Sequence, residues 1–380
     1  FTSSKYKSSA KKIKKAIRKG KGSMKAYEDE LERYLQRVNG VRGLLSVMTM
    51  GSVGAPGLSD LDIICVVEEQ VRVREIPGLD ISARARERGI FVHGPIVVPK
   101  SLVGELNYIF PISTLQNRWG EPLAQMVKPP AKEEQAALAL VYLVDFTFSR
   151  LLQHSIVKTS RVLDKRGWLT RLWSLTHSEK LCNSAGIVLQ PHWIQLLRDI
   201  RSVRDRWNSG DGCSDSQFLN LYRRLEIVHR QLLLETLKGE ALQLEIRKPD
   251  GPVKFRKGFR HIICRKEVGV PQVIHHPTGL WNSVTKINYH TIHAPPEYAL
   301  RLAHYGFSTP ETEHLSNGVH GEILKKRARL VKEHVSFLNR SGIMFSLRGN
   351  LGLPVGRESP VFTLLHRAAW MMLRTYAHSR

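Results

Sequence analysis

Apolar residues recur at two different spacings in the first hundred residues. After Met24 they follow one face of a helix that ends before Gly40 and Gly43, at Tyr27, Leu31, Tyr34, Leu35 and Val38. Three apolar stretches rich in β-branched residues then predict neighbouring strands at 44–50, 61–67 and 90–98. A helix beside a few short strands is the pattern of a small mixed sheet.

The pattern changes at Pro129 and again near residue 241. Helical periodicity predicts helices at 133–153, 191–207 and 216–238, and again near 320–339 and 361–376. Residues 241–295 alternate Ile and Val with Gly, Pro and His, which indicates a β-containing segment. We therefore expect an α+β protein with a basic N-terminal arm at 1–25, a small mixed-sheet domain at 26–129, a mainly helical domain at 130–240 and a mixed, basic C-terminal region at 241–380.

The charge of the chain makes a polyanion the first expected partner. The 380 residues carry 58 Lys and Arg against 34 Asp and Glu, a formal net charge of +24. This excess favours nucleic acid, with an anionic membrane surface second and simple solubility as the plain alternative. Residues 1–25 contain no acid, and we expect this arm to contact phosphates through Lys11, Lys12, Lys14, Lys15, Arg18 and Lys19.

The cysteines and the apolar runs indicate in which compartment we expect the protein and whether we expect it to span a membrane. The four cysteines, Cys65, Cys182, Cys213 and Cys264, show no CxxC pair and no disulfide framework. A cytoplasmic or other reducing intracellular compartment fits. The longest apolar run, 136–148, is short and contains Asp145, so we expect a buried helix and no membrane span.

The residues that carry chemistry lie between the first two predicted strands. Gly51, Gly54 and Gly57 allow backbone geometries that a Cβ would obstruct, so backbone amides there can approach a phosphate. Ser52 adds a hydroxyl donor. Asp60 and Asp62 are two residues apart at the start of a strand, which places both carboxylates on one face and suits Mg²⁺.

This combination resembles the polymerase-β-like nucleotidyltransferase superfamily. Its pattern is a hydrophobic residue, Gly, Ser, a short glycine-containing loop and then Asp-hydrophobic-Asp-hydrophobic, matched here by Met50, Gly51, Ser52, Asp60, Leu61, Asp62 and Ile63. The resemblance covers the first third of the chain. It implies a nucleotidyltransferase domain that binds an NTP at Gly51, Ser52 and Ser59, binds Mg²⁺ or Mn²⁺ at Asp60 and Asp62, and transfers a nucleoside monophosphate to an acceptor hydroxyl.

The sequence departs from the superfamily at the third carboxylate, which a later strand usually supplies. The stretch 90–98 contains no Asp or Glu, and His93 stands where an acid is expected. His93 is either a replacement catalytic base, a sign of lost activity or a plain strand residue. Asp80, Glu87 and Glu105 are weaker substitutes, with Asp80 the best of them.

Three functions follow from these observations. The first is an Mg²⁺-dependent nucleotidyltransferase with RNA as the expected acceptor. The second is a catalytically inactive protein of the same fold that binds RNA or serves as a structural subunit of a larger assembly. The third is a nucleotidyltransferase that acts on a small molecule, for which the positive field disfavours a cationic acceptor.

Several weaker patterns have plain structural explanations beside the functional ones. His275, His276, His290 and His293 lack a diagnostic zinc spacing, and whether they bind metal stays open. Basic and aromatic residues mix in 247–266, as in a nucleic-acid contact or a half-buried strand. The charges of 325–329 are expected on a helix exterior, and most of the tryptophans of the helical region are expected in its core.

Overall fold

The computed structural model describes residues 23–71, 90–91, 94–110, 114–160, 165–208, 212–238, 253–257, 260–265, 267–276, 289–295 and 319–341. Within them the chain is α+β, with a small four-stranded mixed sheet, long helices and a second four-stranded sheet. The α+β prediction with a small mixed sheet is confirmed. The six basic residues assigned to the arm and the predicted helix 361–376 lie outside the described residues.

The first sheet follows helix α2 (Met24–Val38), which begins after the N-cap Ser23. Its strands are β1 (Leu44–Met50), β2 (Asp62–Val67), β3 (Ile96–Pro99) and β4 (Leu115–Gly120). They lie in the order β3-β2-β1-β4, with β1 antiparallel to both β2 and β4, and with β2 parallel to β3. The helix and the strands at 44–50 and 61–67 form where the apolar spacing predicts them.

The predicted strand 90–98 is wrong in extent, because among its described residues (90–91 and 94–98) pairing with β2 begins at Ile96, and β3 continues to Pro99. Pro95 has no N–H to donate to a neighbouring strand, so regular pairing begins after it. Ile90 still lies beside the start of β2, since the Leu61 amide donates to its carbonyl at 2.7 Å. His93 lies outside the described residues.

The two faces of the first sheet pack against different parts of the chain. Val47, Ile63 and Cys65 face α2 and share a core with Tyr27 and Tyr34. The opposite face carries Met48, Ile64, Val66 and Val98, which share a core with α4 (Leu106–Ile109), α5 (Lys132–Ser160) and α11 (Val319–Arg340). Because side chains alternate along a strand, Asp62 lies on this second face.

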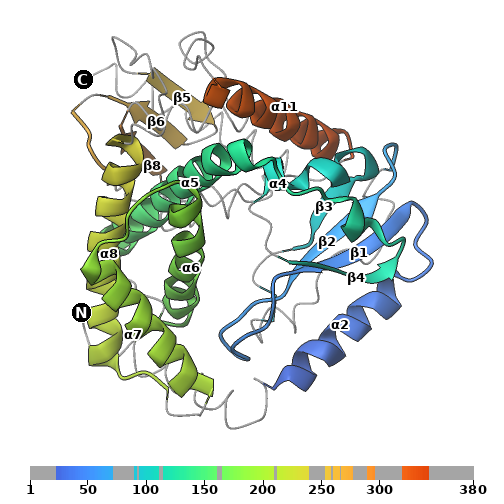
Figure 1. The fold of residues 1–380 in the computed structure, drawn as a ribbon, viewed down its shortest axis with the longest axis horizontal. Helices are drawn as coiled ribbons and strands as arrows, with labels where there is room; N and C mark the ends of the chain where they lie inside the picture. The colour runs from blue at the N-terminus through green and yellow to red at the C-terminus, as the bar shows by residue number, and fades with distance from the viewer. Residues whose placement is uncertain are drawn as a thin grey trace, which may run out of the picture.

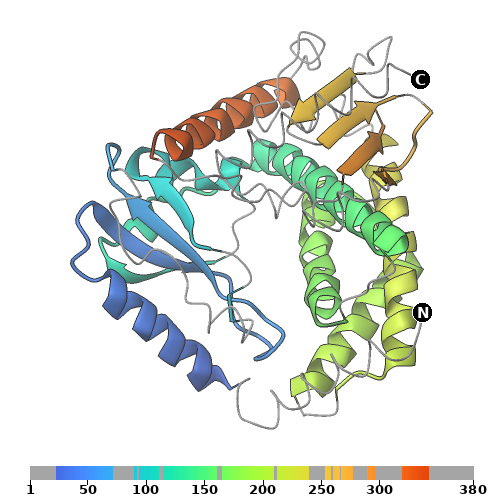
Figure 2. The same ribbon diagram turned by 180° about the vertical axis from the view of Figure 1, so that it is seen from behind.

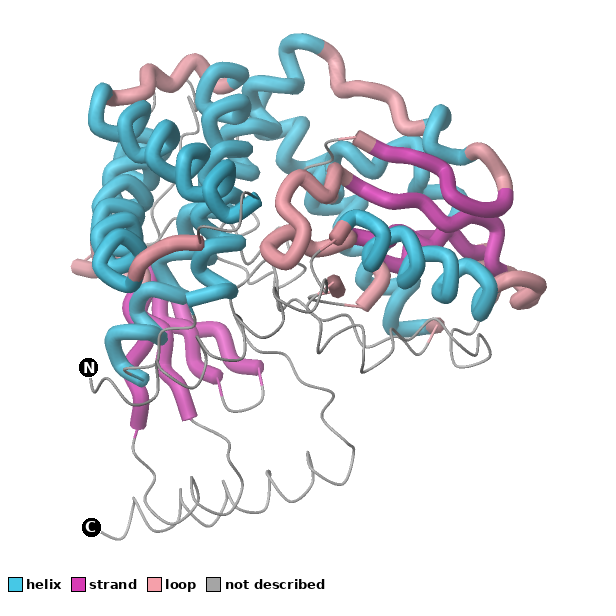
Figure 3. The backbone as a smooth tube through the Cα atoms, turned by 90° about the horizontal axis from the view of Figure 1, so that it is seen from below, coloured by secondary structure: helices cyan, strands magenta, loops and turns pink. Residues whose placement is uncertain are grey.

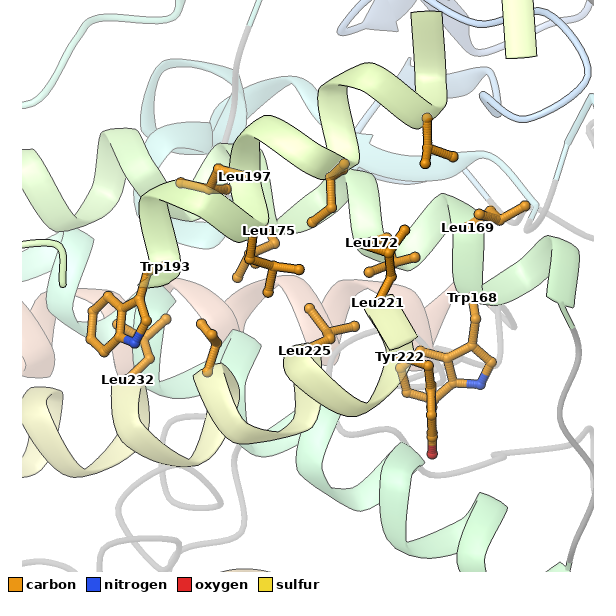
Figure 4. Packing of buried hydrophobic residues seen from close by; sticks show 14 of the residues in the cluster. Trp168, Leu169, Leu172, Leu175, Trp193, Leu197, Leu221, Tyr222, Leu225 and Leu232 are labelled. Atoms are coloured by element: carbon orange, nitrogen blue, oxygen red, sulfur yellow. The ribbon is translucent and has the colours of Figure 1, made fainter. Parts of the chain in front are cut away.

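Four long helices form the middle of the chain: α5 (Lys132–Ser160), α6 (Lys165–Ser184), α7 (Pro191–Asn208) and α8 (Asp215–Lys238). Their buried leucines and aromatic rings interdigitate, as Figure 4 shows for α6, α7 and α8. In the part of α5 from Glu134 to Ser155 the sequence is long and apolar enough to cross a membrane, but 72% of it is buried inside the protein. This burial is that of a core helix.

The second sheet consists of β5 (Val253–Lys257), β6 (Arg260–Cys264), β7 (Gln272–His276) and β8 (Tyr289–Ala294), in the order β5-β6-β8-β7. It packs against α5 on the side away from the first sheet (Figures 1 and 3). Helix α11 (Val319–Arg340) then returns to the first sheet beside β3 (Figure 2), and Phe337 and Leu338 join the core that includes Val47 and Tyr34.

The prediction that the charges of 325–329 form a helix exterior is wrong for Arg327. Its side chain is 1% exposed, and Nη2 lies 2.8 Å from the Asp145 carboxylate on α5. A buried guanidinium needs such a partner, because burial removes its hydration. The flanking charges behave as predicted, since Lys325 and Arg329 are exposed.

Candidate functional site

The connection between β1 and β2, residues 51–61, is called the glycine loop here, and it extends from the sheet toward α6 and α7 (Figure 1). Gly51 ends β1 with φ +76°, a conformation that favours glycine, and its amide donates to the Thr114 carbonyl at 2.8 Å. Ser52 follows and is exposed. Because Met50 pairs with Asp62, the strand ends bring Ser52 close to the start of β2.

Hydrogen bonds within the glycine loop fold it into a compact turn. The Leu58 and Ser59 amides donate to the Ala55 carbonyl at 3.0 and 2.8 Å, and the Ala55 amide donates to the Ser59 hydroxyl at 3.0 Å. The Gly54 amide donates to the Ser52 carbonyl at 3.1 Å. Within the described chain, the amides of Ser52 and Val53 have no protein acceptor, so they remain available at the end of β1.

Helices on both sides of the glycine loop hold its backbone. The Tyr27 hydroxyl of α2 donates to the Ser59 carbonyl at 2.6 Å and accepts from the Gly57 amide at 3.0 Å. Thr170 of α6 donates to the Leu58 carbonyl at 2.9 Å. Ala55 and Leu58 are buried in the core of the helical region, so the loop is anchored by apolar packing as well.

Ser59, a predicted nucleotide-binding residue, has its hydroxyl directed into the protein. Its Oγ accepts from the Ala55 amide and, at 3.0 Å, from Nη2 of Arg204 on α7. The guanidinium of Arg204 also stacks over Trp173 of α6 at 3.6 Å. Burial lowers the pKa of Arg204 to about 10, which leaves it charged at neutral pH.

Asp60 and Asp62 are both partly buried at the entrance to β2, and Asp62 is its first residue. Arg150 of α5 lies within the electrostatic field of Asp60. Burial and the charge of Arg171 lower the pKa of Arg150 to about 9, and Asp60 opposes this shift. The predicted metal site therefore has Arg150 of α5 near one of its two carboxylates.

The strand beside β2 supplies no carboxylate at the level of Asp62. The described pairing of β2 with β3 begins at Ile64 and Ile96, and the Leu61 amide donates to the Ile90 carbonyl, so the register is not continuous to Asp62 and Gly94 lies between these two contacts. Glu105 is paired with Lys326 at 3.3 Å, while Asp80 and Glu87 lie outside the described residues. Among the residues that the structure describes, no three His, Cys, Asp or Glu side chains form a group able to hold a metal ion.

The histidines of the second sheet share a ladder. His275 of β7 is the Cα partner of His290 of β8, and His293 of β8 pairs with Gln272. This placement follows the alternation predicted for 241–295, and the metal question for this cluster remains as open as the sequence left it.

Sequence reasoning missed the residues that reach the glycine loop from far along the chain. Arg150, Thr170 and Arg204 have no motif, and Arg204 lies 145 positions from Ser59. It also missed β4, whose alternation is masked by polar residues, and α6. A signal for α6 was present, because Trp168, Leu169, Leu172 and Leu175 follow helical spacing and are buried.

Comparisons of the chain with protein-family models, with curated proteins and with solved structures found no match.

Proposed function

We propose that the protein is an Mg²⁺-dependent nucleotidyltransferase that transfers a nucleoside monophosphate from an NTP to a hydroxyl of an RNA acceptor. The observation that carries this proposal is the end of the β1–β2 pair. There, an exposed serine with available amides and a carboxylate at the start of the partner strand come together on a mixed sheet. Phosphate donors and metal ligands side by side are what phosphoryl transfer requires.

The roles of the residues follow from their chemistry. The Ser52 hydroxyl and the amides of Ser52 and Val53 would donate hydrogen bonds to the terminal phosphates. Asp60 and Asp62 would hold Mg²⁺ or Mn²⁺, since carboxylate oxygens are the ligands that these cations prefer. The cation would offset negative charge on the phosphate and orient it for in-line attack. His93 remains a candidate base for the acceptor hydroxyl.

Positive charge on the helical side of the site supports a polyphosphate substrate. Arg150 feels the charges of both Arg171 and Asp60, so a second positive charge lies near the arginine that faces the first carboxylate, and a bound anion would be favoured there. The net charge of +24 extends the same preference to a polyanionic acceptor. The predicted basic arm is the first candidate to contact it.

A second function is favoured by the lack of an acid in 90–98, the segment that follows β2 into β3. A catalytically inactive protein of this fold, which binds RNA or supports a larger assembly, needs no carboxylate on the strand beside Asp62. The described residues of that segment provide none. The two functions differ in whether Asp60 and Asp62 are required.

Incorporation of labelled nucleotide into an RNA pool tests the proposal. We expect incorporation with at least one of the four NTPs in Mg²⁺ or Mn²⁺, and its loss in the Asp60→Asn/Asp62→Asn variant. No incorporation with any NTP would overturn the enzyme proposal. RNA binding that persists in the double variant, with a steep dependence on salt, would then support the binding function.

Gly94→Asp offers a sharper comparison of the two functions. A Cβ at Gly94 meets no heavy atom within 4 Å, so the site has room for a side chain. If the site lacks only a third carboxylate, this variant should gain Mn²⁺ binding or incorporation over the wild type. If another group already completes the site, the added charge should leave incorporation unchanged or reduce it.

A further inference from the structure

The glycine loop is anchored by its backbone at Tyr27 and Thr170, and Arg204 of α7 donates to one of its polar side chains. The Ser59 hydroxyl receives the Ala55 amide from within the loop and Nη2 of Arg204 from α7. Ser59 therefore links the turn of the loop to the helical region. Because Ser59 directly precedes Asp60, movement of this link would displace a proposed metal ligand.

Gly54 shows how closely the loop backbone approaches the guanidinium. A Cβ placed on Gly54 would lie 2.5 Å from Nη2 of Arg204, which is closer than real contacts allow. The absence of a side chain at Gly54 thus leaves space for Arg204 to reach Ser59. This gives the glycine a packing reason that is separate from phosphate binding.

The chemistry of arginine fits this position better than that of lysine. The plane of the guanidinium lies over the Trp173 ring at 3.6 Å, and its edge donates to Ser59. A lysine ammonium has no planar face, so it cannot stack and donate in the same arrangement. Within the described residues Arg204 makes no ion pair, so its bond to Ser59 is not one half of a carboxylate clasp.

We infer that Arg204 is a positioning residue: it fixes the conformation of the glycine loop from α7, so that Ser52 and Asp60 are held ready for nucleotide. This inference rests on the proposed function for its effect on nucleotide, but its effect on the loop stands by itself. It also means that α7, which is distant in sequence from Gly51, Ser52, Asp60 and Asp62, keeps the loop that carries them in one conformation.

Hydrogen exchange of the 51–61 segment tests the link without any need for activity. The amides of Ala55, Gly57, Leu58 and Ser59 are hydrogen-bonded in the loop, so they report its opening. We expect exchange at least about tenfold faster in Arg204→Met and in Ser59→Ala, because a charged hydrogen bond is lost in each. The double variant should exchange no faster than Ser59→Ala at Gly57, Leu58 and Ser59, since both single changes remove the bond between Arg204 and Ser59; the Ala55 amide is left out of this comparison because Ser59→Ala also removes its acceptor.

Matched variants separate this role from general stability. Arg198→Met changes an exposed arginine of the same helix and should leave the exchange of 51–61 unchanged. Gly54→Ala keeps both partners but pushes the guanidinium away, and should speed exchange as Ser59→Ala does. Arg204→Lys should recover only part of the protection. Unchanged exchange in Ser59→Ala and Gly54→Ala would overturn the inference even if Arg204→Met fails to fold.

The effect of this link on nucleotide binding is tested by measuring KM and kcat separately. We expect KM for the NTP to rise about tenfold or more in Ser59→Ala, with a smaller change in kcat, because the loop must be ordered before nucleotide binds. If exchange responds as expected but the wild type binds no nucleotide, the proposed function fails while the link stands. If exchange does not respond, the link fails whatever the activity.

Discussion

Two junctions join distant parts of this protein through a buried arginine, and they are built differently. At the α11–α5 junction, Arg327 donates to the carboxylate of Asp145 at 2.8 Å and lies beside the Tyr142 ring. At the α7–loop junction, Arg204 donates at 3.0 Å to the hydroxyl of Ser59. The first junction joins an acid to a base, and the second joins a base to a neutral group.

The difference between the partners of Arg327 and Arg204 indicates that the two arginines have different roles. A paired guanidinium and carboxylate cancel each other's charge, so the α11–α5 junction needs no further charged group. At the α7–loop junction the bond of Arg204 is to a neutral hydroxyl of the loop that presents Ser52, and the acidic group acting on Arg204 is its chain neighbour Asp205. We interpret the first as a structural clasp and the second as part of a site that expects an anion.

Removing one partner of the Arg327–Asp145 pair should give the largest loss of folding stability. Asp145→Asn leaves Arg327 buried without its counter-charge, and we expect unfolding to become easier by about 3–5 kcal/mol, measured by urea denaturation. The double variant Asp145→Leu/Arg327→Met should lose much less, because no charge stays buried. A single variant that costs under about 1 kcal/mol would show that the clasp is not a buried ion pair.

An intermediate loss of stability is expected when the hydrogen bonds between α2 and the glycine loop are removed. Tyr27→Phe removes the hydroxyl that bridges the Ser59 carbonyl and the Gly57 amide, which should cost about 1–3 kcal/mol. Hydrogen exchange of 51–61 should accelerate. Tyr34→Phe is the matched control, since Tyr34 is a buried tyrosine of the same helix whose hydroxyl lies 3.2 Å from the Cys65 sulfur, away from the loop. Equal acceleration in both variants would contradict the assignment.

The two junctions also show what the sequence can reveal. Local periodicity predicted α2, β1 and the entrance to β2, because each element buries its own apolar face within a few residues of chain. The motif residues Gly51, Ser52 and Asp62 were found for the same reason. Arg204 and Arg327 could not be placed, since charged residues at helical positions look alike whether exposed or buried, and their partners are 145 and 182 positions away.

The third carboxylate illustrates a different limit. The sequence showed that 90–98 contains no acid, but the structure was needed to show that the described pairing with β2 begins at Ile96 and that Ile90 contacts Leu61. Register depends on where pairing starts, and Pro95 delays that start in a way that hydrophobic pattern alone does not specify.

The smallest predicted change is a loss of stability at low pH, and it separates the α11 side of the protein from the α7–loop junction. His334 of α11 is buried and donates from Nε2 to the Val97 carbonyl of β3 at 2.8 Å. Burial lowers the pKa of His334 below its ordinary value near 6.5, and the hydrogen bond to Val97 only partly opposes this. The unfolded chain therefore binds a proton that the folded chain resists, so stability is highest above pH 6.5 and falls as the pH drops toward the folded pKa.

His334→Gln keeps an N–H donor but cannot titrate, so it should be less sensitive to acid. Between pH 7.5 and 5.5 we expect the melting temperature of the wild type to fall further than that of the variant by about 2 °C, for a difference on the order of 1 kcal/mol. Other groups such as His229, whose pKa burial also lowers, act equally in both proteins and cancel. Hydrogen exchange should locate the wild-type loss in α11 and leave 51–61 unchanged, because the bond between Arg204 and Ser59 does not titrate in this range. An equal loss in 51–61 would show that the two junctions open together and that the loop is not controlled independently from α7.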